Sequence, residues 1–150
     1  MRIAVLNGPN LNLLGTREPG LYGRETLADV EMRLGGVGRE LGIALEFAQR
    51  NGEGELIDVV HAMRGRVDGA IVNAGAYSHT SLALRDAFAA VSMPFVEVHV
   101  TNVYAREPER RHSMLASAAV GVVCGLGTLG YELALRGLVA RLAATAAARG

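Results

Sequence analysis

The stretch GAIVNAGAYSHTSLALRDAFAAV, residues 69–91, decides the fold. It opens with a short apolar run, Gly69–Asn73, and passes through a small polar loop into Thr80–Val91, which has a helical pattern of apolar residues. A run that is apolar throughout is typical of a strand buried on both faces, because a half-exposed strand alternates apolar and polar residues. The stretch therefore predicts a buried strand followed by a helix.

The same unit recurs on both sides of this stretch. Four further apolar runs are expected to be strands: Arg2–Leu6, Ile43–Ala48, Phe95–Val98 and Ala119–Cys124. Three further helical patterns cover Leu27–Leu41, Glu55–Arg66 and Leu129–Ala147. Thr26 with Asp29 is expected to cap the first of these helices. Alternating strands and helices without hairpin signals predict an α/β, flavodoxin-like fold: a five-stranded doubly wound parallel sheet with helices on both faces.

Composition narrows the class of protein. The chain has 150 residues, which favours a single domain over residues 1–150, and its formal net charge is zero. Neutral charge removes the usual electrostatic reason to expect a nucleic acid or membrane partner. Cys124 is the one cysteine, so neither an intrachain disulfide nor a cysteine-based zinc cluster can form. The apolar run at the N-terminus is too short for a signal peptide or a membrane span, and a cytoplasmic location is expected.

Ligands of such folds bind beyond the carboxyl ends of the strands, so the loops after the strands are the candidate sites. The loop after the first strand is long and rich in glycine and proline, which predicts a mobile lid within about residues 15–25. It carries Asn10, Arg17 and Tyr22. No phosphate-binding glycine signature is present. The alternative is an ordinary surface loop whose asparagines and glycines serve turns.

Two later loops add polar groups. Asn73 ends one strand and His79 follows it, so the pair is a plausible set of substrate donors, although a lone histidine is more often an ordinary loop residue. Glu97 and His99 are two residues apart and share a face of their strand, where a carboxylate can orient an imidazole for acid catalysis. The alternative is a solvated face on an edge strand.

Arg106 and Arg110 follow at i, i+4 spacing. On a helical turn both would point toward a carboxylate or hydroxyl groups, whereas the alternative is solvated charge in a short connector. Asp86 lies within the helix after His79, and on its own it is more simply a surface carboxylate.

Taken together and in order, these loops resemble the type II 3-dehydroquinate dehydratase family. The stretches that carry the resemblance span nearly the whole chain: Leu6–Gly15, Arg17–Pro19 leading to Tyr22–Gly23, Gln49–Gly54, Asn73–Ser81, Glu97–His99, Arg106–Glu107, Arg110–Ser113, and Gly125–Gly127 leading to Gly130–Tyr131. Each stretch alone is weakly specific, but the ordered set is highly specific.

The resemblance implies a fold, a reaction and an assembly. The fold is the flavodoxin-like domain already inferred. The reaction is the anti elimination of water from 3-dehydroquinate to 3-dehydroshikimate, through an enolate and without a metal, cofactor or Schiff base. It is a step of the shikimate pathway toward aromatic amino acids. The assembly is a homo-oligomeric dodecamer built as a tetramer of trimers.

It also implies roles for particular residues. Tyr22 would be the base, Arg17 would favour its phenolate, and Asn10 would help hold the enolate oxygen through an ordered water. His99, oriented by Glu97, would protonate the departing hydroxyl. The remaining positions would bind substrate or support the site: Asn73, the Val100 backbone and the Thr101 hydroxyl at the carboxylate, His79 and Arg110 at ring hydroxyls, Arg106 near the base and lid, and Asp86 reaching a neighbouring subunit's site.

Three departures from the family pattern, Thr101, Pro108 and Glu109, remove none of these chemical groups.

Two alternatives remain: a flavin- or nucleotide-binding protein of the same fold, and a non-enzymatic paralogue that serves as a binding or assembly module. The absence of a phosphate-binding glycine signature from the chain argues against the first alternative. The second alternative predicts that a key chemical group has been lost, yet all the groups named above are present. The sequence contains no lysine, which excludes a Schiff base on a lysine side chain.

Overall fold

The structure is a computed structural model and describes residues 1–150. Five strands form one sheet in the order β2-β1-β3-β4-β5, and every neighbouring pair is parallel. The strands are β1 (Arg2–Asn7), β2 (Ala44–Gln49), β3 (Gly69–Asn73), β4 (Phe95–His99) and β5 (Gly121–Cys124). The predicted fold is therefore confirmed, and the strand ends differ from the sequence expectation by one or two residues.

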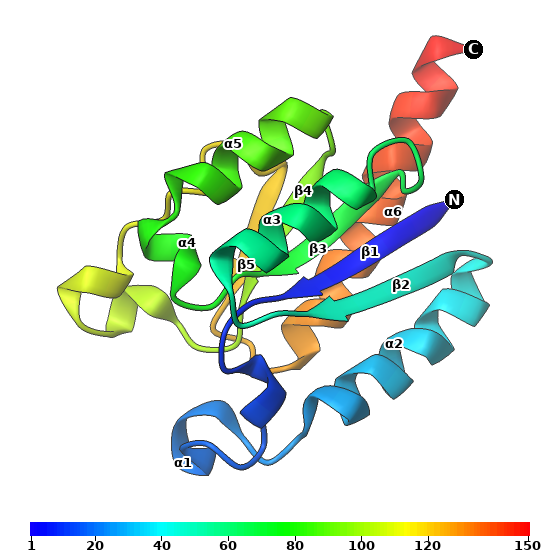
Figure 1. Cartoon of the computed structure of the whole chain (residues 1–150). Helices are drawn as coiled ribbons and strands as arrows, with labels where there is room; N and C mark the ends of the chain where they lie inside the picture. Colours follow the sequence, from blue (N-terminus) through cyan, green and yellow to red (C-terminus); the bar gives the residue numbers. More distant parts are fainter.

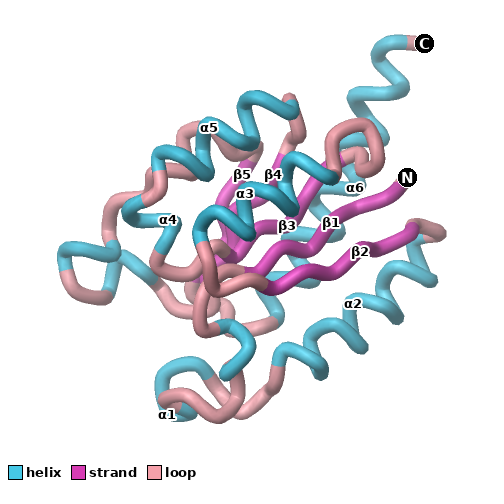
Figure 2. Tube along the Cα trace, in the orientation of Figure 1, coloured by secondary structure: helices cyan, strands magenta, loops and turns pink.

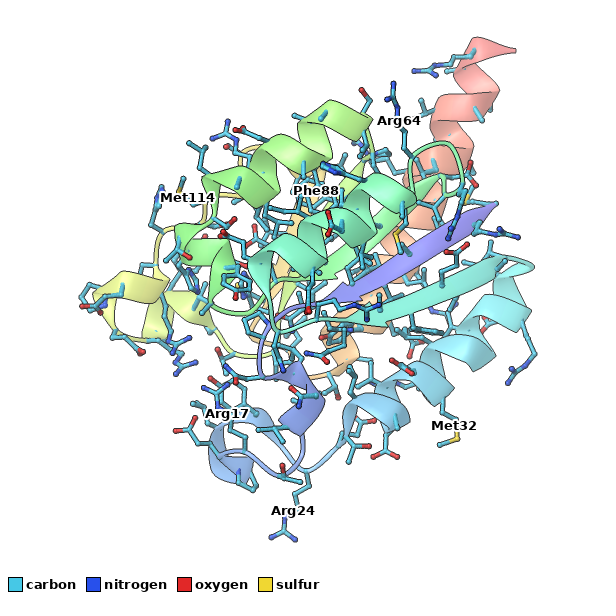
Figure 3. The ribbon with its side chains drawn as sticks, viewed as in Figure 1. Arg17, Arg24, Met32, Arg64, Phe88 and Met114 are labelled. Atoms are coloured by element: carbon cyan, nitrogen blue, oxygen red, sulfur yellow. The ribbon has the colours of Figure 1, made fainter.

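Helices cover both faces of the sheet, as Figure 1 shows. Helices α2 (Leu27–Leu41) and α6 (Leu129–Arg149) lie on one face, and α3 (Glu53–Ala62) and α5 (Leu82–Val91) lie on the other. The alternation of side chains along β1 divides the core between them, since Ile3 and Val5 pack toward α2 and α6 while Ala4 and Leu6 pack toward α3 and α5. Phe88 of α5, labelled in Figure 3, stacks on Phe95 of β4 in this second layer.

Three predicted helices have different bounds in the structure, and one of them, α6, ends only two residues beyond the expected Ala147. The expected helix Glu55–Arg66 begins and ends earlier, as α3, and the chain then turns through Gly65 at a positive φ of 71°. The expected helix Thr80–Val91 begins two residues later, as α5, and a separate short helix, α4 (Tyr77–Thr80), precedes it. The Ser81 backbone is extended, and its hydroxyl accepts the amide N–H of Leu84 at 2.9 Å, so Ser81 starts a new helix. The capping box predicted for α2 is present.

The remaining short elements gather at the carboxyl end of the sheet (Figure 2). They are η1 (Leu11–Leu13), α1 (Pro19–Tyr22), α4, η2 (Val103–Ala105) and η3 (Pro108–Arg110). The loops after β1 and β3 touch at Gly8, where a Cβ atom would lie 2.3 Å from the carbonyl oxygen of Ala74. Only glycine allows this approach, and it brings the two loops to one site. No helix has the length and apolar character needed to cross a membrane.

Candidate active site

One cavity opens at the carboxyl end of the sheet, where the lid and the loops after β3 and β4 meet. Arg17 lies at this end of the molecule (Figure 3). Ten of the twelve residues that the sequence singled out line the cavity: Asn10, Arg17, Tyr22, Asn73, His79, His99, Val100, Thr101, Arg106 and Arg110. Of the other two, Glu97 is fully buried beneath the cavity, and Asp86 is exposed on α5 away from it.

The phenol of Tyr22 lies between two guanidinium groups. The Cζ atom of Arg17 is 5.2 Å from the centre of the Tyr22 ring, and that of Arg106 is 5.5 Å from it. Arg106 Nη1 also donates a hydrogen bond to the Tyr22 hydroxyl oxygen at 2.7 Å. The Tyr22 ring and its hydroxyl therefore both face positive charge, which is the arrangement that a tyrosine acting as a base requires. The sequence indicated Arg17 for this task, whereas the structure adds a direct contact from Arg106.

The two ends of the lid meet at Gly15. Its φ is +88°, and a Cβ atom there would lie 2.7 Å from the carbonyl oxygen of Arg24. Glu25, just beyond, accepts a hydrogen bond from Arg33 Nη1 of α2 at 2.7 Å and another from the Thr128 hydroxyl. Arg33 Nη2 in turn donates to the Thr128 carbonyl at 2.8 Å. This Glu25–Arg33–Thr128 cluster fixes the end of the lid to α2 and to the start of α6.

Asn10 stands at the mouth of the cavity in a left-handed conformation, with φ of 68°. Its amide N–H donates to Asn51 Oδ1 at 3.0 Å, and Gln49 Nε2 donates to the same oxygen at 3.0 Å and to the Gly8 carbonyl at 3.1 Å. Gln49 and Asn51 thus hold the loop that presents Asn10. The resemblance included this segment without giving either residue a role.

Asn73 is held from below by a buried tyrosine. Asn73 Nδ2 donates to the Tyr131 hydroxyl at 2.8 Å, and that hydroxyl donates to Asn7 Oδ1 at 2.6 Å. The Gly75 amide donates to Asn73 Oδ1 at 3.2 Å. These contacts leave one N–H of the Asn73 amide free for a ligand. Burial raises the pKa of Tyr131 well above its usual range, against the hydrogen bond from Asn73, so Tyr131 remains a neutral donor.

His99 is paired with a fully buried carboxylate. His99 Nε2 lies 2.6 Å from Glu97 Oε1, and the imidazole is 7% exposed to the cavity. A carboxylate oxygen accepts, so Nε2 carries a proton and Nδ1 is left to face a ligand. β4 is an inner strand, which excludes the alternative of a solvated edge. The pair fits an acid catalyst.

His79 of α4 stacks on His99, with ring centres 5.7 Å apart. Its Nδ1 atom lies 2.8 Å from the carbonyl oxygen of His112. Because a carbonyl only accepts, Nδ1 is the protonated nitrogen and Nε2 is left for a ligand hydroxyl. This geometry agrees with a substrate-binding position.

The helical turn expected to align Arg106 with Arg110 is absent. η2 ends at Ala105, and η3 begins at Pro108, which has no N–H to continue a helix. Both arginines still line the cavity because Glu107 holds them, with Oε1 2.5 Å from Arg110 Nε and Oε2 3.5 Å from Arg106 Nε. The hydrogen bond from Arg110 lowers the pKa of Glu107 and raises the pKa of Arg110. Pro108 and Glu109, the departures from the pattern, belong to η3 and leave the cavity lining intact.

Comparison with known proteins identifies the family. The chain matches the family described as Dehydroquinase class II over residues 1–139. The chain belongs to this family. Among its relatives, the 3-dehydroquinate dehydratase of Gemmatimonas aurantiaca is 66% identical over 142 residues, covering 95% of this chain and 93% of the relative. The enzyme of the same name from Synechococcus sp. is 56% identical over 142 residues, covering 95% and 97%.

Solved class II dehydroquinases share the fold as well. The crystal structure of type II dehydroquinase from Butyrivibrio crossotus superposes with a TM-score of 0.90 at 39% identity, covering 92% of this chain and 97% of that one. The enzyme from Propionibacterium acnes gives 0.87 at 42% identity, covering 91% and 94%. The predicted family is therefore confirmed, and the reading as a non-enzymatic paralogue has no support among these relatives.

Proposed function

We propose that this chain dehydrates 3-dehydroquinate to 3-dehydroshikimate by anti elimination through an enolate. The observation that carries the proposal is one cavity that holds both a tyrosine flanked by two arginines and a histidine paired with a buried carboxylate. The tyrosine with its arginines suits the removal of a proton from carbon, and the histidine with its carboxylate suits the protonation of a leaving group. The names of the relatives point to the same reaction.

Tyr22 is the proposed base. A tyrosine in water keeps its proton until about pH 10, so it needs neighbouring positive charge to act as a phenolate near neutral pH. Arg17 and Arg106 supply that charge from two sides. The phenolate takes the proton from C2 of the substrate, and the electrons of the C–H bond move to the ketone oxygen as an enolate. Asn10 holds the enolate oxygen through an ordered water.

His99 is the proposed acid. The enolate collapses, the bond from the neighbouring carbon to its hydroxyl breaks, and His99 gives its proton to the departing oxygen to form water. The charge of Glu97, fully buried and 2.6 Å away, stabilises the imidazolium that this step requires. The histidine and the tyrosine are then each one proton away from their starting states, and exchange with water restores both.

The other cavity groups bind the substrate. Asn73, the Val100 backbone and the Thr101 hydroxyl hold its carboxylate, and His79 and Arg110 hold its ring hydroxyls. Residues 1–150 act as one catalytic domain, with residues 15–25 as a lid that closes over the ligand and brings Arg17 and Tyr22 to it. The closure at Gly15 supports this division, since it marks where the lid leaves the body of the fold.

We further propose a homo-oligomer, a dodecamer built as a tetramer of trimers, in the cytoplasm. Three leucines in and just before the first turns of α6, Leu126, Leu129 and Leu133, are 55%, 49% and 41% exposed, which favours contact with another copy. Asp86 would then reach the cavity of a neighbouring subunit. The cytoplasm fits a reaction of biosynthesis and a free thiol at Cys124.

The test is absorbance at the enone band after 3-dehydroquinate is added to the purified protein, with and without borohydride. We expect a rise that borohydride does not prevent, because no lysine is present to form a reducible imine. Folded protein that gives no rise would overturn the proposed reaction. A rise that borohydride abolishes would overturn the mechanism.

A further inference from the structure

Ser113 contacts the acid pair from outside the cavity. Its hydroxyl oxygen lies 2.7 Å from Glu97 Oε1, the same atom that receives His99 Nε2. Ser113 does not line the cavity, so it has no direct route to the substrate. Ser113 is the last residue of the Arg110–Ser113 stretch, in which the resemblance implies a role for Arg110 alone.

The direction of this hydrogen bond is fixed by the surroundings of Ser113. The amides of Leu115 and Ala116 both donate to the Ser113 hydroxyl oxygen, each at 3.0 Å. A hydroxyl has two acceptor lone pairs and one proton, so its proton is left for Glu97. Glu97 Oε1 therefore receives two protons at once, one from Ser113 and one from His99.

The residues on either side of Ser113 are themselves held in place by contacts with α4 and the core. The carbonyl of His112 accepts from His79, and the amide of Met114 donates to the Ser78 carbonyl at 2.7 Å. Leu115 is fully buried in the layer beneath α3 and α5. Residues 112–115 thus connect α4, β4 and the core, and they hold the Ser113 hydroxyl in one place (Met114 marks the segment in Figure 3).

We propose that Ser113 is a positioning residue for the acid step, and that its hydroxyl controls how strongly Glu97 stabilises the imidazolium of His99. A donor on a carboxylate stabilises its negative charge and weakens its pull on a second donor. Glu97 Oε2 has no partner and is fully buried, so Oε1 carries both of the contacts. The proposal rests on the proposed role of His99 in the reaction.

Loss of the Ser113 hydroxyl should stabilise the protonated form of His99. Removal of the Ser113 hydroxyl leaves Glu97 to interact with His99 alone, which favours the imidazolium and makes its proton harder to give up. The other ionisable groups that face the pair stay the same: His79 of α4 stacks on His99, and Tyr22, Arg17, Arg106 and Arg110 border the same cavity. The change is therefore assigned to the Ser113 contact.

The test is a pH–rate profile of Ser113→Ala beside an NMR titration of the histidine ring signals. The chain has four histidines, so substitution can assign the His99 signal. We expect the His99 midpoint and the alkaline limb of kcat to move up by about one pH unit, the size of one charge-assisted hydrogen bond. We also expect kcat to fall several-fold while KM stays near its original value.

Three further variants complete the design. Ser113→Thr keeps the hydroxyl and should restore the original profile, and Ser113→Cys, a weaker donor, should give a smaller shift and carries the test if the alanine variant does not fold. Ser81→Ala is the control: the Ser81 hydroxyl also accepts a hydrogen bond from a backbone amide, but it does not contact Glu97. We expect this substitution to lower Tm without moving the His99 midpoint or the alkaline limb of kcat.

An unmoved His99 midpoint in both the alanine and the cysteine variants would overturn the role of Ser113. The NMR titration uses the free enzyme, so it reads the Ser113 contact independently of turnover. A shifted midpoint with an unshifted rate profile would retain the contact and remove His99 from the rate-limiting chemistry, which would count against the proposed acid step and not against Ser113.

Discussion

At the scale of single residues, orientation in this cavity comes from hydrogen bonds between side chains of different elements. Arg106 contacts the phenol of Tyr22, and Tyr131 holds Asn73. Each of these contacts joins residues far apart in the chain. The chemistry of the cavity residues is therefore set by the packing of the whole sheet with its loops.

Tyr22→Phe removes the proposed base together with the hydrogen bond from Arg106 Nη1 to its hydroxyl, while the ring keeps its place beside Arg17 and Arg106. We expect the rate to fall by about 10²–10⁴-fold, the usual contribution of a positioned base. Substrate binding, measured by calorimetry, should change little. Tyr104→Phe is the matched control because Tyr104 is 61% exposed and does not line the cavity. Retained turnover in Tyr22→Phe would assign the base elsewhere.

Tyr131→Phe leaves Asn7 and Asn73 without a shared partner in the buried layer. An unsatisfied buried group costs about 1–3 kcal/mol, so we expect a loss of unfolding free energy of that order and a rise in KM as Asn73 loses its orientation. Denaturant unfolding at pH 8 and substrate kinetics measure the two effects. Equal stability and KM in the variant would show that Asn73 is held by Gly75 alone.

The same substitution has a pH signature. The folded pKa of Tyr131 is raised by burial, so the folded state keeps a proton that the unfolded chain releases above about pH 10. This contribution to stability is complete below pH 10 and is lost as the pH rises beyond it. The wild-type protein should therefore lose more unfolding free energy between pH 8 and 11 than Tyr131→Phe does.

At the scale of elements, the lid depends on how its far end is fixed. Glu25, Arg33 and Thr128 join it to α2 and α6. We expect Arg33→Gln to loosen this end, which should speed trypsin cleavage after Arg17 and Arg24 and lower kcat/KM several-fold. Arg39→Gln on the same helix is the control, since Arg39 makes no side-chain hydrogen bond or ion pair. Equal cleavage rates in both variants would mean that the lid moves independently of this cluster.

The positions of strands and helices are the part of the structure that the sequence predicts best. All five strands and the bounds of α2 follow from apolar patterns and a capping box, because these are local or periodic properties. The i, i+4 spacing of Arg106 and Arg110 suits a helical turn that the structure does not contain, because Pro108 lacks the N–H that would continue it. The two arginines reach one cavity through Glu107 instead.

The partners within the site were the least predictable part. The sequence placed Asn10, Tyr22, His99 and their neighbours at the carboxyl end of the sheet, and the structure brings these together. The resemblance indicates Arg106 only as a residue near the base, without its hydrogen bond to Tyr22, and nothing in the sequence indicates that Ser113 would bond to Glu97. Such pairs depend on the exact paths of loops in space, to which neither periodicity nor spacing is sensitive.

At the scale of the whole molecule, one proposed site residue lies outside the cavity of its own chain. Asp86 is exposed on α5, so a role in catalysis requires a second copy of the chain. The leucines at the start of α6 offer a surface for such assembly, and Leu129→Glu with Leu133→Glu should reduce the mass measured by sedimentation. Wild-type mass in that double variant would place the contacts elsewhere.

Mixed oligomers test whether Asp86 serves a neighbour. Asp86→Ala and Tyr22→Phe are each expected to be poorly active alone. If a site takes Tyr22 from one subunit and Asp86 from another, random mixing of equal amounts after dissociation gives about a quarter of sites with both residues intact. We therefore expect activity to return on mixing, to about a quarter of the wild-type value. If both residues served one subunit's site, no mixture would regain activity, and full activity of Asp86→Ala alone would remove Asp86 from the site.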